Sequence, residues 1–138
     1  MLFNRTTSSG HRFFKANVVG TNGLVILPDD WVNNSPISIS NYDLVNSDYS
    51  TSLSKLNWYQ YFGDCVFLPA AGYMYGSPGM FSPYTLTYVG DGTIGMYWLN
   101  DSCDARRAYA LFFAPGSLSV IPMSKNICCS VHLFLYER

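Results

Sequence analysis

Charged side chains are scarce in this chain, and glutamate is nearly absent. Charged residues make up 12% of the 138 residues, about half the usual share. Glu137 is the one glutamate, so an active site built on paired carboxylates would have to use aspartates. The one basic pair, Arg106–Arg107, is typical of a solvated strand or turn, and the net charge is −1. We therefore expect no nucleic-acid partner, because such binding needs clustered positive charge.

Long apolar runs are also missing. The longest, such as Leu24–Leu27 and Cys65–Leu68, have the size of strands, far below the roughly 18–20 residues that span a bilayer. The N-terminal stretch MLFNRTTSSGHRFFKA contains no apolar signal core. We expect no membrane insertion, and an exported form of this chain would be part of a longer or processed protein.

Potential metal ligands are few, and their spacing matches no zinc pattern. They are His11, His132, Cys65, Cys103, Cys128 and Cys129. The neighbours Cys128 and Cys129 would face opposite sides of a strand and so would not pair with each other. A chain of this length can also build its core without disulfide bonds. We expect most thiols to be free, with a redox or disulfide role as the alternative. No nucleophile, histidine and carboxylate can be assigned to one catalytic site from the sequence. We therefore expect that the chain is not an enzyme and has no cofactor and no metal.

Apolar and aromatic residues are plentiful by contrast. They reach 49% and 17% of the chain, enough for one domain spanning residues 1–138, with residues 1–10 loose. Stiff aromatic side chains suit a binding surface and fill a core equally well, so composition leaves both uses open.

The first half of the chain predicts strands, irregular loops and one good helix. Strands are expected at 11–19, 24–27 and 65–68, a turn at 20–23, and loops at 32–50 and 72–83. The helix is expected over 52–62, capped by Ser52 and ended by Gly63, with a buried stripe of Leu53, Leu56, Tyr59 and Phe62. Asp29 or Asp30 suits a helix cap, and a metal or ligand site is the alternative use of that pair.

The second half predicts a series of short strands separated by glycine. They are expected at 84–89, 95–99, 108–114, 117–121 and 129–136. Helix and irregular segments first and a strand meander last indicate an α+β domain with an antiparallel sheet.

Three stretches carry a resemblance to a known family. They are GLVILPDDW at 23–31, VFLPAAGYMYG at 66–76 and GMYW at 95–98, followed by AYALFF and later by CSVHLF. Together they resemble the fibrobacter major-paralogous type of domain in surface proteins of gut Bacteroidetes. The resemblance covers residues 13–135, and LPAAGY with its spacing to GMYW is its most specific part. The chain departs from the family at Met74, where the family has Arg, and at Cys128, where it tends to have Gly.

The resemblance implies both a fold and a function. The family is similar to C-type-lectin-like folds of the formylglycine-generating-enzyme type, with one or two helices packed on an antiparallel sheet and irregular loops. Variable proteins of diversity-generating retroelements share this scaffold and rewrite exposed C-terminal positions. The resemblance implies a secreted or cell-surface display domain, an adhesin or a diversified variable protein, that binds a protein or a glycan through its C-terminal face. The alternative is a structural domain of a larger surface protein, without a ligand of its own.

The family pattern also implies which residues face outward. Its constant residues, among them Gly95, Tyr97 and Trp98, alternate with the other positions of the last strands, which would place the constant set inward. We expect Trp31, Phe67, Leu68, Tyr97, Trp98 and Val131 to be largely buried. We expect the binding face to consist of Thr93, Ile94, Met96, Leu99, Asn100, Asp101, Arg106, Arg107, Phe112, Pro115, Ile121, Met123, Ile127 and His132.

Calcium and copper sites of related folds have only faint counterparts here. Residues 98–101, Trp-Leu-Asn-Asp, are similar to the Trp-Asn-Asp calcium motif of sugar-binding C-type lectins, but Leu99 interrupts it. Asp91, Asn100, Asp101 and Asp104 offer some of the six to eight oxygen ligands that calcium needs, and a solvated acidic turn explains them as well. The adjacent cysteines at 128 and 129 do not have the spacing of the copper-binding pair in the fold's enzyme relatives.

Overall fold

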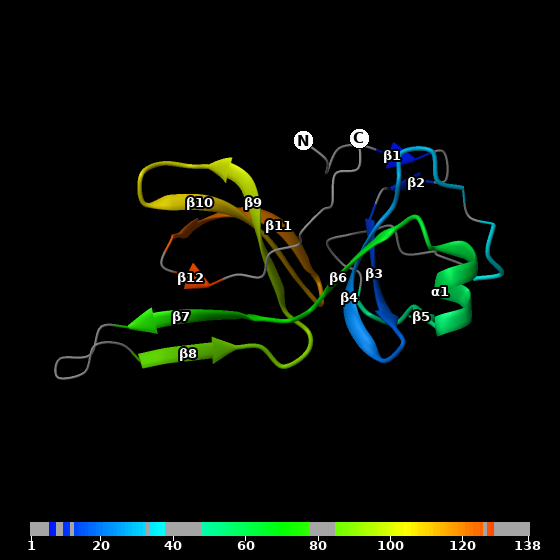
Figure 1. The fold of residues 1–138 in the computed structure, drawn as a ribbon, viewed down its shortest axis with the longest axis horizontal. Coiled ribbons are helices and arrows are strands. Elements are labelled where there is room, and N and C mark those ends of the chain that lie inside the picture. Colours follow the sequence, from blue (N-terminus) through cyan, green and yellow to red (C-terminus); the bar gives the residue numbers. More distant parts are fainter. Residues whose placement is uncertain are drawn as a thin grey trace.

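The computed structural model describes residues 6–7, 10–11, 13–32, 34–37, 48–77, 85–125 and 127–128. In this part the chain is α+β and strand-rich, with one short helix, as expected (Figure 1). None of the described helical residues forms a segment long and apolar enough to cross a membrane. Two short strands, β1 (Thr6–Thr7) and β2 (Gly10–His11), pair with each other. Residues 6, 7 and 10 of the stretch expected to be loose thus belong to paired strands, and the rest of residues 1–10 lie outside the described residues.

The first half of the chain forms a four-stranded central sheet in the order β5–β3–β4–β6. Its strands are β3 (Phe13–Val18), β4 (Thr21–Ile26), β5 (Ser52–Leu53) and β6 (Val66–Pro69). The β3–β4 turn consists of Val19 and Gly20 alone, shorter than the turn expected at 20–23. Asp29 and Asp30 form a turn closed by a hydrogen bond from Trp31 N to Pro28 O of 3.1 Å. They cap no helix there.

Helix α1 (Lys55–Tyr61) begins later than the sequence pattern predicts. Ser54 caps it, since its hydroxyl accepts a hydrogen bond from Asn57 N at 3.2 Å, whereas Ser52 belongs to β5. Leu53 and Phe62 are buried, at 2% and 0% exposure, but Leu56 and Tyr59 are 70% and 69% exposed, so the expected buried stripe is confirmed at its two ends and wrong at Leu56 and Tyr59. Trp58 and Tyr61 pack against the core cluster in place of Leu56 and Tyr59, because residues 58, 61 and 62 lie on one side of the helix.

Two clusters of apolar side chains cover the two faces of the central sheet. The first packs against α1, and Phe62 lies at its centre, with ring centroids 5.4 Å from Trp31 and 5.9 Å from Phe14. The second packs against the C-terminal sheet and contains Phe13, Leu24, Leu68, Ala70, Tyr97, Leu111 and Phe113. The central sheet therefore lies between the helix and a second sheet (Figure 1).

The C-terminal sheet is an antiparallel meander in the order β11–β10–β9. Its strands are β9 (Gly95–Ser102), β10 (Arg107–Ala114) and β11 (Ser117–Ser124), close to the strands expected at 95–99, 108–114 and 117–121. A third sheet joins β7 (Tyr73–Ser77), β8 (Thr85–Val89) and β12 (Ile127–Cys128) in the order β12–β7–β8. Residues 73–77 were expected in a loop, but pairing with β8 makes them a strand. The strand expected at 129–136 lies outside the described residues.

The LPAAGY motif joins the central sheet to the other two sheets. The hydroxyl of Tyr97 donates to Pro69 O at 2.7 Å, and Tyr88 donates to Ala71 O at 2.7 Å. Gly72 N donates to Ile94 O at 2.7 Å, and the φ of Gly72 is 75°. A side chain at Gly72 would also meet Val89 O at 2.4 Å, so glycine is required here. The motif is scaffold.

Candidate functional site

Most of the residues expected to bind a ligand fall on the C-terminal sheet and its turns. Thr93 and Ile94 precede β9, and Met96, Leu99, Asn100 and Asp101 lie on it. Arg106 precedes β10, Arg107 and Phe112 lie on it, and Pro115 is in the following turn. Ile121 and Met123 are on β11, and Ile127 is on β12. His132 and Val131 lie outside the described residues.

Strand register divides the C-terminal sheet into two faces. Directly paired residues share a face, and neighbours along a strand alternate. The near face, towards the central sheet, carries Tyr97, which pairs with Leu111, and Gly95, which pairs with Phe113. The far face, turned away from that core, carries Met96, Trp98, Ala108, Ala110, Phe112, Ser119, Ile121 and Met123. Four expected binding residues thus share one face: Met96, Phe112, Ile121 and Met123.

Burial corrects some of these assignments. Met96 is 2% exposed, so it is not a surface residue, because β9 is covered on both faces at this point. Leu99 packs against the cluster that contains Tyr97 and therefore belongs to the core side. Trp98 pairs with Ala110 on the far face and is half-buried. Two neighbouring residues of a strand point to opposite faces. Tyr97 and Trp98 therefore cannot both point towards the core, and the expectation that both do is wrong for Trp98.

The other expected core residues follow the sequence pattern more closely. Trp31, Leu68 and Tyr97 are buried, as expected, with exposed fractions of 8%, 4% and 6%. Phe67 is half-buried and packs against the helix-side cluster.

The expected binding residues do not form one cluster, because they lie at both ends of the sheet. β10 has eight residues, so its ends are about 23 Å apart at about 3.3 Å per residue. Thr93 lies at the end next to the central sheet, where its carbonyl accepts a 2.5 Å hydrogen bond from Tyr49 and its amide and hydroxyl donate to Asp91. These contacts belong to the scaffold. Asn100, Arg106 and Arg107 are exposed towards the opposite end.

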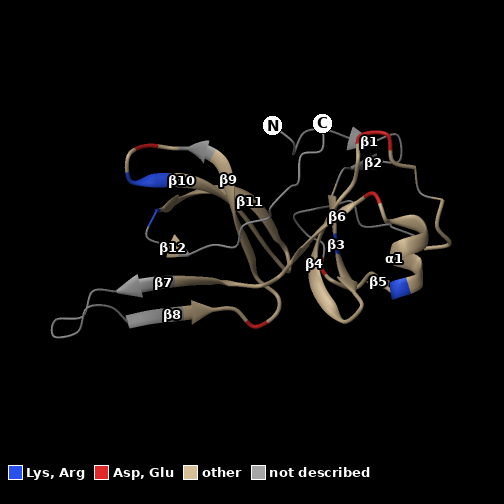
Figure 2. Ribbon diagram, in the orientation of Figure 1, with Lys and Arg blue, Asp and Glu red and all other residues tan. Residues whose placement is uncertain are grey.

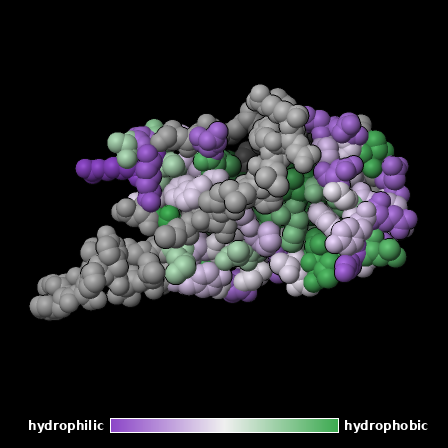
Figure 3. Space-filling model, viewed as in Figure 1, coloured by the Kyte–Doolittle hydropathy of each residue, from purple (hydrophilic) through white to green (hydrophobic). Residues whose placement is uncertain are grey.

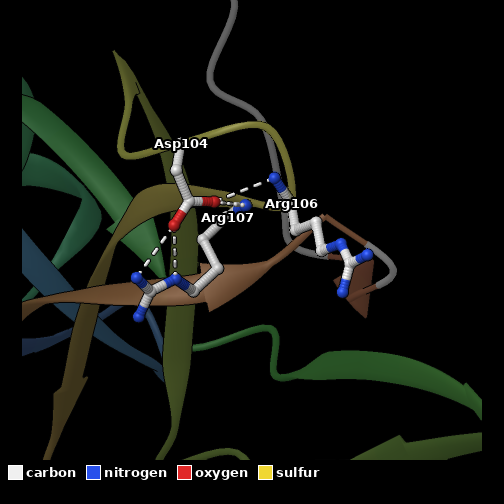
Figure 4. A network of polar contacts seen from close by, with 3 residues as sticks. All are labelled: Asp104, Arg106 and Arg107. Carbon is white, nitrogen blue, oxygen red and sulfur yellow. Dashed lines mark hydrogen bonds and ion pairs between the residues drawn. The ribbon is translucent and has the colours of Figure 1, made fainter.

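We call this opposite end the tip, defined as residues 103–107 with Ser124 and Lys125. Asp104 organises it (Figure 4). Asp104 Oδ1 accepts from the backbone amides of Arg106 and Arg107, each at 2.8 Å. Its Oδ2 accepts from Arg107 Nε at 2.9 Å and lies 2.8 Å from Arg107 Nη2. The tip turn is therefore held by one carboxylate that bonds both backbone and side chain.

This network shifts the titration of both partners. Hydrogen bonds from the Arg106 amide and the Arg107 side chain hold the pKa of Asp104 below its ordinary value. The hydrogen bond to Asp104 raises the pKa of Arg107. Both groups are exposed, so solvent screens the interaction, and the network orders the turn rather than anchoring the fold.

Arg106 extends away from this network. Figure 4 shows its guanidinium directed away from Asp104 and Arg107, and no carboxylate among the described residues pairs with it. An open hollow of about 470 Å³ beside it is lined by Asp104, Ala105, Arg106, Arg107 and Ser124. Lys125 N donates to Arg106 O at 2.9 Å, which places Lys125 next to Arg106 in the backbone. Figure 2 shows these charges gathered at this end, and Figure 3 shows hydrophilic atoms projecting from it.

Sequence reasoning named Arg106 and Arg107 but missed the roles of Asp104, Ser124 and Lys125. The available signal was the order Asp-Ala-Arg-Arg at 104–107, because an aspartate commonly accepts hydrogen bonds from amides two and three residues on. Ser124 has no such local signal, since it reaches the tip only by pairing with Arg107 across β10 and β11.

Metal and thiol chemistry have no assembled centre in the part of the chain that the structure describes. No three His, Cys, Asp or Glu side chains there lie close enough to hold a metal ion. Asp91 bonds Thr93 and Asp104 bonds Arg107, at opposite ends of the sheet, so these two of the possible calcium ligands lie apart. Cys65 and Cys103 are free thiols, and burial raises the pKa of Cys65 to about 12.

Lys15 is the one charged side chain that is buried among the described residues, at 2% exposure. It pairs with Leu24 on the side of the central sheet that faces the C-terminal sheet. The pKa of Asp48 is lowered mainly by hydrogen bonds from Ser50 and to a smaller extent by the charge of Lys15. Lys15 therefore belongs to the junction between the sheets and is remote from the tip.

Comparison of the chain with protein families, with curated proteins and with solved structures found no match.

Proposed function

We propose that this chain is a ligand-binding display domain of C-type-lectin-like fold, an adhesin or a retroelement-diversified variable protein at the cell surface or secreted. Its ligand is a protein or a glycan, bound by the C-terminal sheet, and it carries out no catalysis. The observation that carries the proposal is the far face. Phe112, Ile121 and Met123 are apolar, lie on the side away from the core cluster of Tyr97 and Leu111, and are only half-buried.

The way the sheet is held also supports a display role. The near face is fixed to the central sheet by the buried side chains of Leu111 and Phe113 and by the bond from Tyr97 to Pro69. Substitutions on the far face and at the tip therefore leave these anchors untouched. A scaffold that tolerates surface change while its core stays constant is what a binding display domain requires.

A second candidate is a structural domain that packs on a neighbour within a larger surface protein. The burial of Met96 and Ala110, at 2% and 0% exposure, favours it. Packing already covers the centre of the far face, and only its rim is available for contact.

The test is to add charge to the far face without removing a core side chain. Ser119 is exposed and pairs with Phe112, so Ser119→Glu places a carboxylate among the apolar residues. Ser52→Glu, at an exposed serine of β5, is the matched control. The wild-type chain and both variants are applied to an array of glycans and extracellular protein domains, and their thermal unfolding is recorded.

We expect the wild-type chain and Ser52→Glu to bind the same array members, and Ser119→Glu to lose them while its unfolding stays cooperative. Absence of any bound array member, or binding that Ser119→Glu leaves intact, contradicts the proposal. A reverse transcriptase gene beside this one, with an imperfect repeat of codons 90–134, would establish diversification. Tandem copies of the domain in one polypeptide, without such a repeat, would favour the structural role.

A further inference from the structure

The tip differs in charge from the rest of the molecule. Arg106, Arg107 and Lys125 are three of the eight Lys and Arg residues in a chain of net charge −1. Between residues 100 and 125 the only acidic residues are Asp101 and Asp104. A local excess of positive charge therefore sits at one end of a weakly acidic protein.

Most of this charge is available to a ligand. Asp104 is occupied by Arg107 and by two backbone amides. The guanidinium of Arg106 projects from a turn that these bonds hold in place (Figure 4). An arginine presented on an ordered turn loses less entropy when it binds than one on a loose loop. Its planar donors match a carboxylate with two parallel hydrogen bonds.

We propose that Arg106 and Lys125 bind carboxylates of an acidic polypeptide segment in the ligand, with Ser124 lining the site; this rests on the proposed function and gives its ligand a chemistry. The backbone bond from Lys125 N to Arg106 O places these two residues beside each other, and Ser124 and Arg106 line the same hollow. Met123, a half-buried residue of the far face, adjoins Ser124 and pairs with Ala108 beside Arg107.

A polypeptide fits these neighbours better than an acidic glycan or a nucleic acid. Arg and Met are enriched where proteins meet proteins. Among residues 103–107, 124 and 125 no aromatic side chain offers a stacking surface for a sugar or a base. A nucleic acid would also need many more cations than three.

The experiment measures binding of fluorescent poly-L-glutamate by anisotropy, with heparin as the acidic glycan. The variant is Arg106→Ala/Lys125→Ala, and the control is Lys55→Ala, which removes an exposed cation from α1. We expect the double variant to bind poly-L-glutamate about tenfold more weakly, as for the loss of one or two charge-assisted hydrogen bonds. Lys55→Ala should change the affinity by less than about twofold because screening isolates distant charges.

Equal binding by the double variant and the wild-type chain overturns the inference, and so does binding of heparin but not of poly-L-glutamate. These outcomes differ from failure of the proposed function. If the double variant keeps the array ligand and Ser119→Glu loses it, the display role stands and the acidic chemistry is wrong. If Ser119→Glu changes nothing, the display role itself fails.

Discussion

The hydroxyl of Tyr97 donates a hydrogen bond of 2.7 Å to the carbonyl oxygen of Pro69. Tyr97 is on β9 of the C-terminal sheet, and Pro69 is the last residue of β6 in the central sheet. This bond therefore crosses the junction between the two sheets. The ring of Tyr97 stacks on Phe113 with centroids 6.2 Å apart. The residue thus acts through both its ring and its hydroxyl.

Tyr97→Phe keeps the ring and removes the hydroxyl, leaving the Pro69 carbonyl without this donor. We expect a loss of about 1–2 kcal/mol in the free energy of unfolding, measured by urea denaturation. Tyr88→Phe is the control, because its hydroxyl bonds Ala71 at the same distance but Tyr88 is 54% exposed. Water can replace that bond, so the control should lose less. Equal losses would show that burial does not set the strength of these bonds.

Val19 is in a strained conformation that a different residue would relieve. Its φ is 51° and that of Gly20 is 86°, as in a two-residue turn with two left-handed positions. A β-branched residue is a rare occupant of that region. Val19→Asn should raise the free energy of unfolding by about 1 kcal/mol, since Asn-Gly is the preferred pair in such turns. Val32→Asn, at another exposed valine, should give no gain, and a gain of similar size there would refute the explanation.

Alkaline pH should destabilise the fold before it affects the tip. Burial raises the pKa of Tyr49 from 10.0 to about 12, and that of Cys65 from 9.0 to about 12. Both groups stay protonated to a higher pH in the folded chain than in the unfolded chain. Their contribution to the free energy of unfolding is therefore complete below pH 9 and is lost as pH rises towards 12. The urea midpoint should fall across this window. Tyr49→Phe should make the urea midpoint less dependent on pH, whereas Tyr59→Phe, at an exposed tyrosine, should not. A midpoint that does not change with pH would contradict the raised pKa values of Tyr49 and Cys65.

Asp104 neutralises Arg107, so removing its charge should make the tip more basic. Asp104→Asn retains an oxygen for the amides of Arg106 and Arg107 and releases the Arg107 guanidinium. We expect poly-L-glutamate to bind at least about twofold more tightly, with a steeper decrease on going from about 50 to about 300 mM salt. Asp30→Asn, at an exposed aspartate far along the chain, serves as the control. Weaker binding of poly-L-glutamate by Asp104→Asn would contradict this expectation. It would mean that losing the order of the turn lowers the affinity more than the added positive charge raises it.

The sequence alone determined where most strands lie. The segments at 95–99, 108–114 and 117–121 became β9, β10 and β11 because apolar and β-branched residues fill them and Gly116 ends one turn. It also identified Trp31, Leu68 and Tyr97 as core residues, since large apolar side chains at strand spacing are buried on one face.

Tertiary structure decided what depended on distant partners. Ser52 and Leu53 left the predicted helix because Asn17 and Val19 donate backbone hydrogen bonds to Thr51 and Leu53, a gain that local helix propensity does not include. Residues 73–77 became a strand only through pairing with β8. Met96 is buried because packing covers both faces of β9, and Ser124 reaches the tip only by its pairing with Arg107. Spacing along a strand specifies which residues share a face, but which face is covered depends on the layers that pack against it.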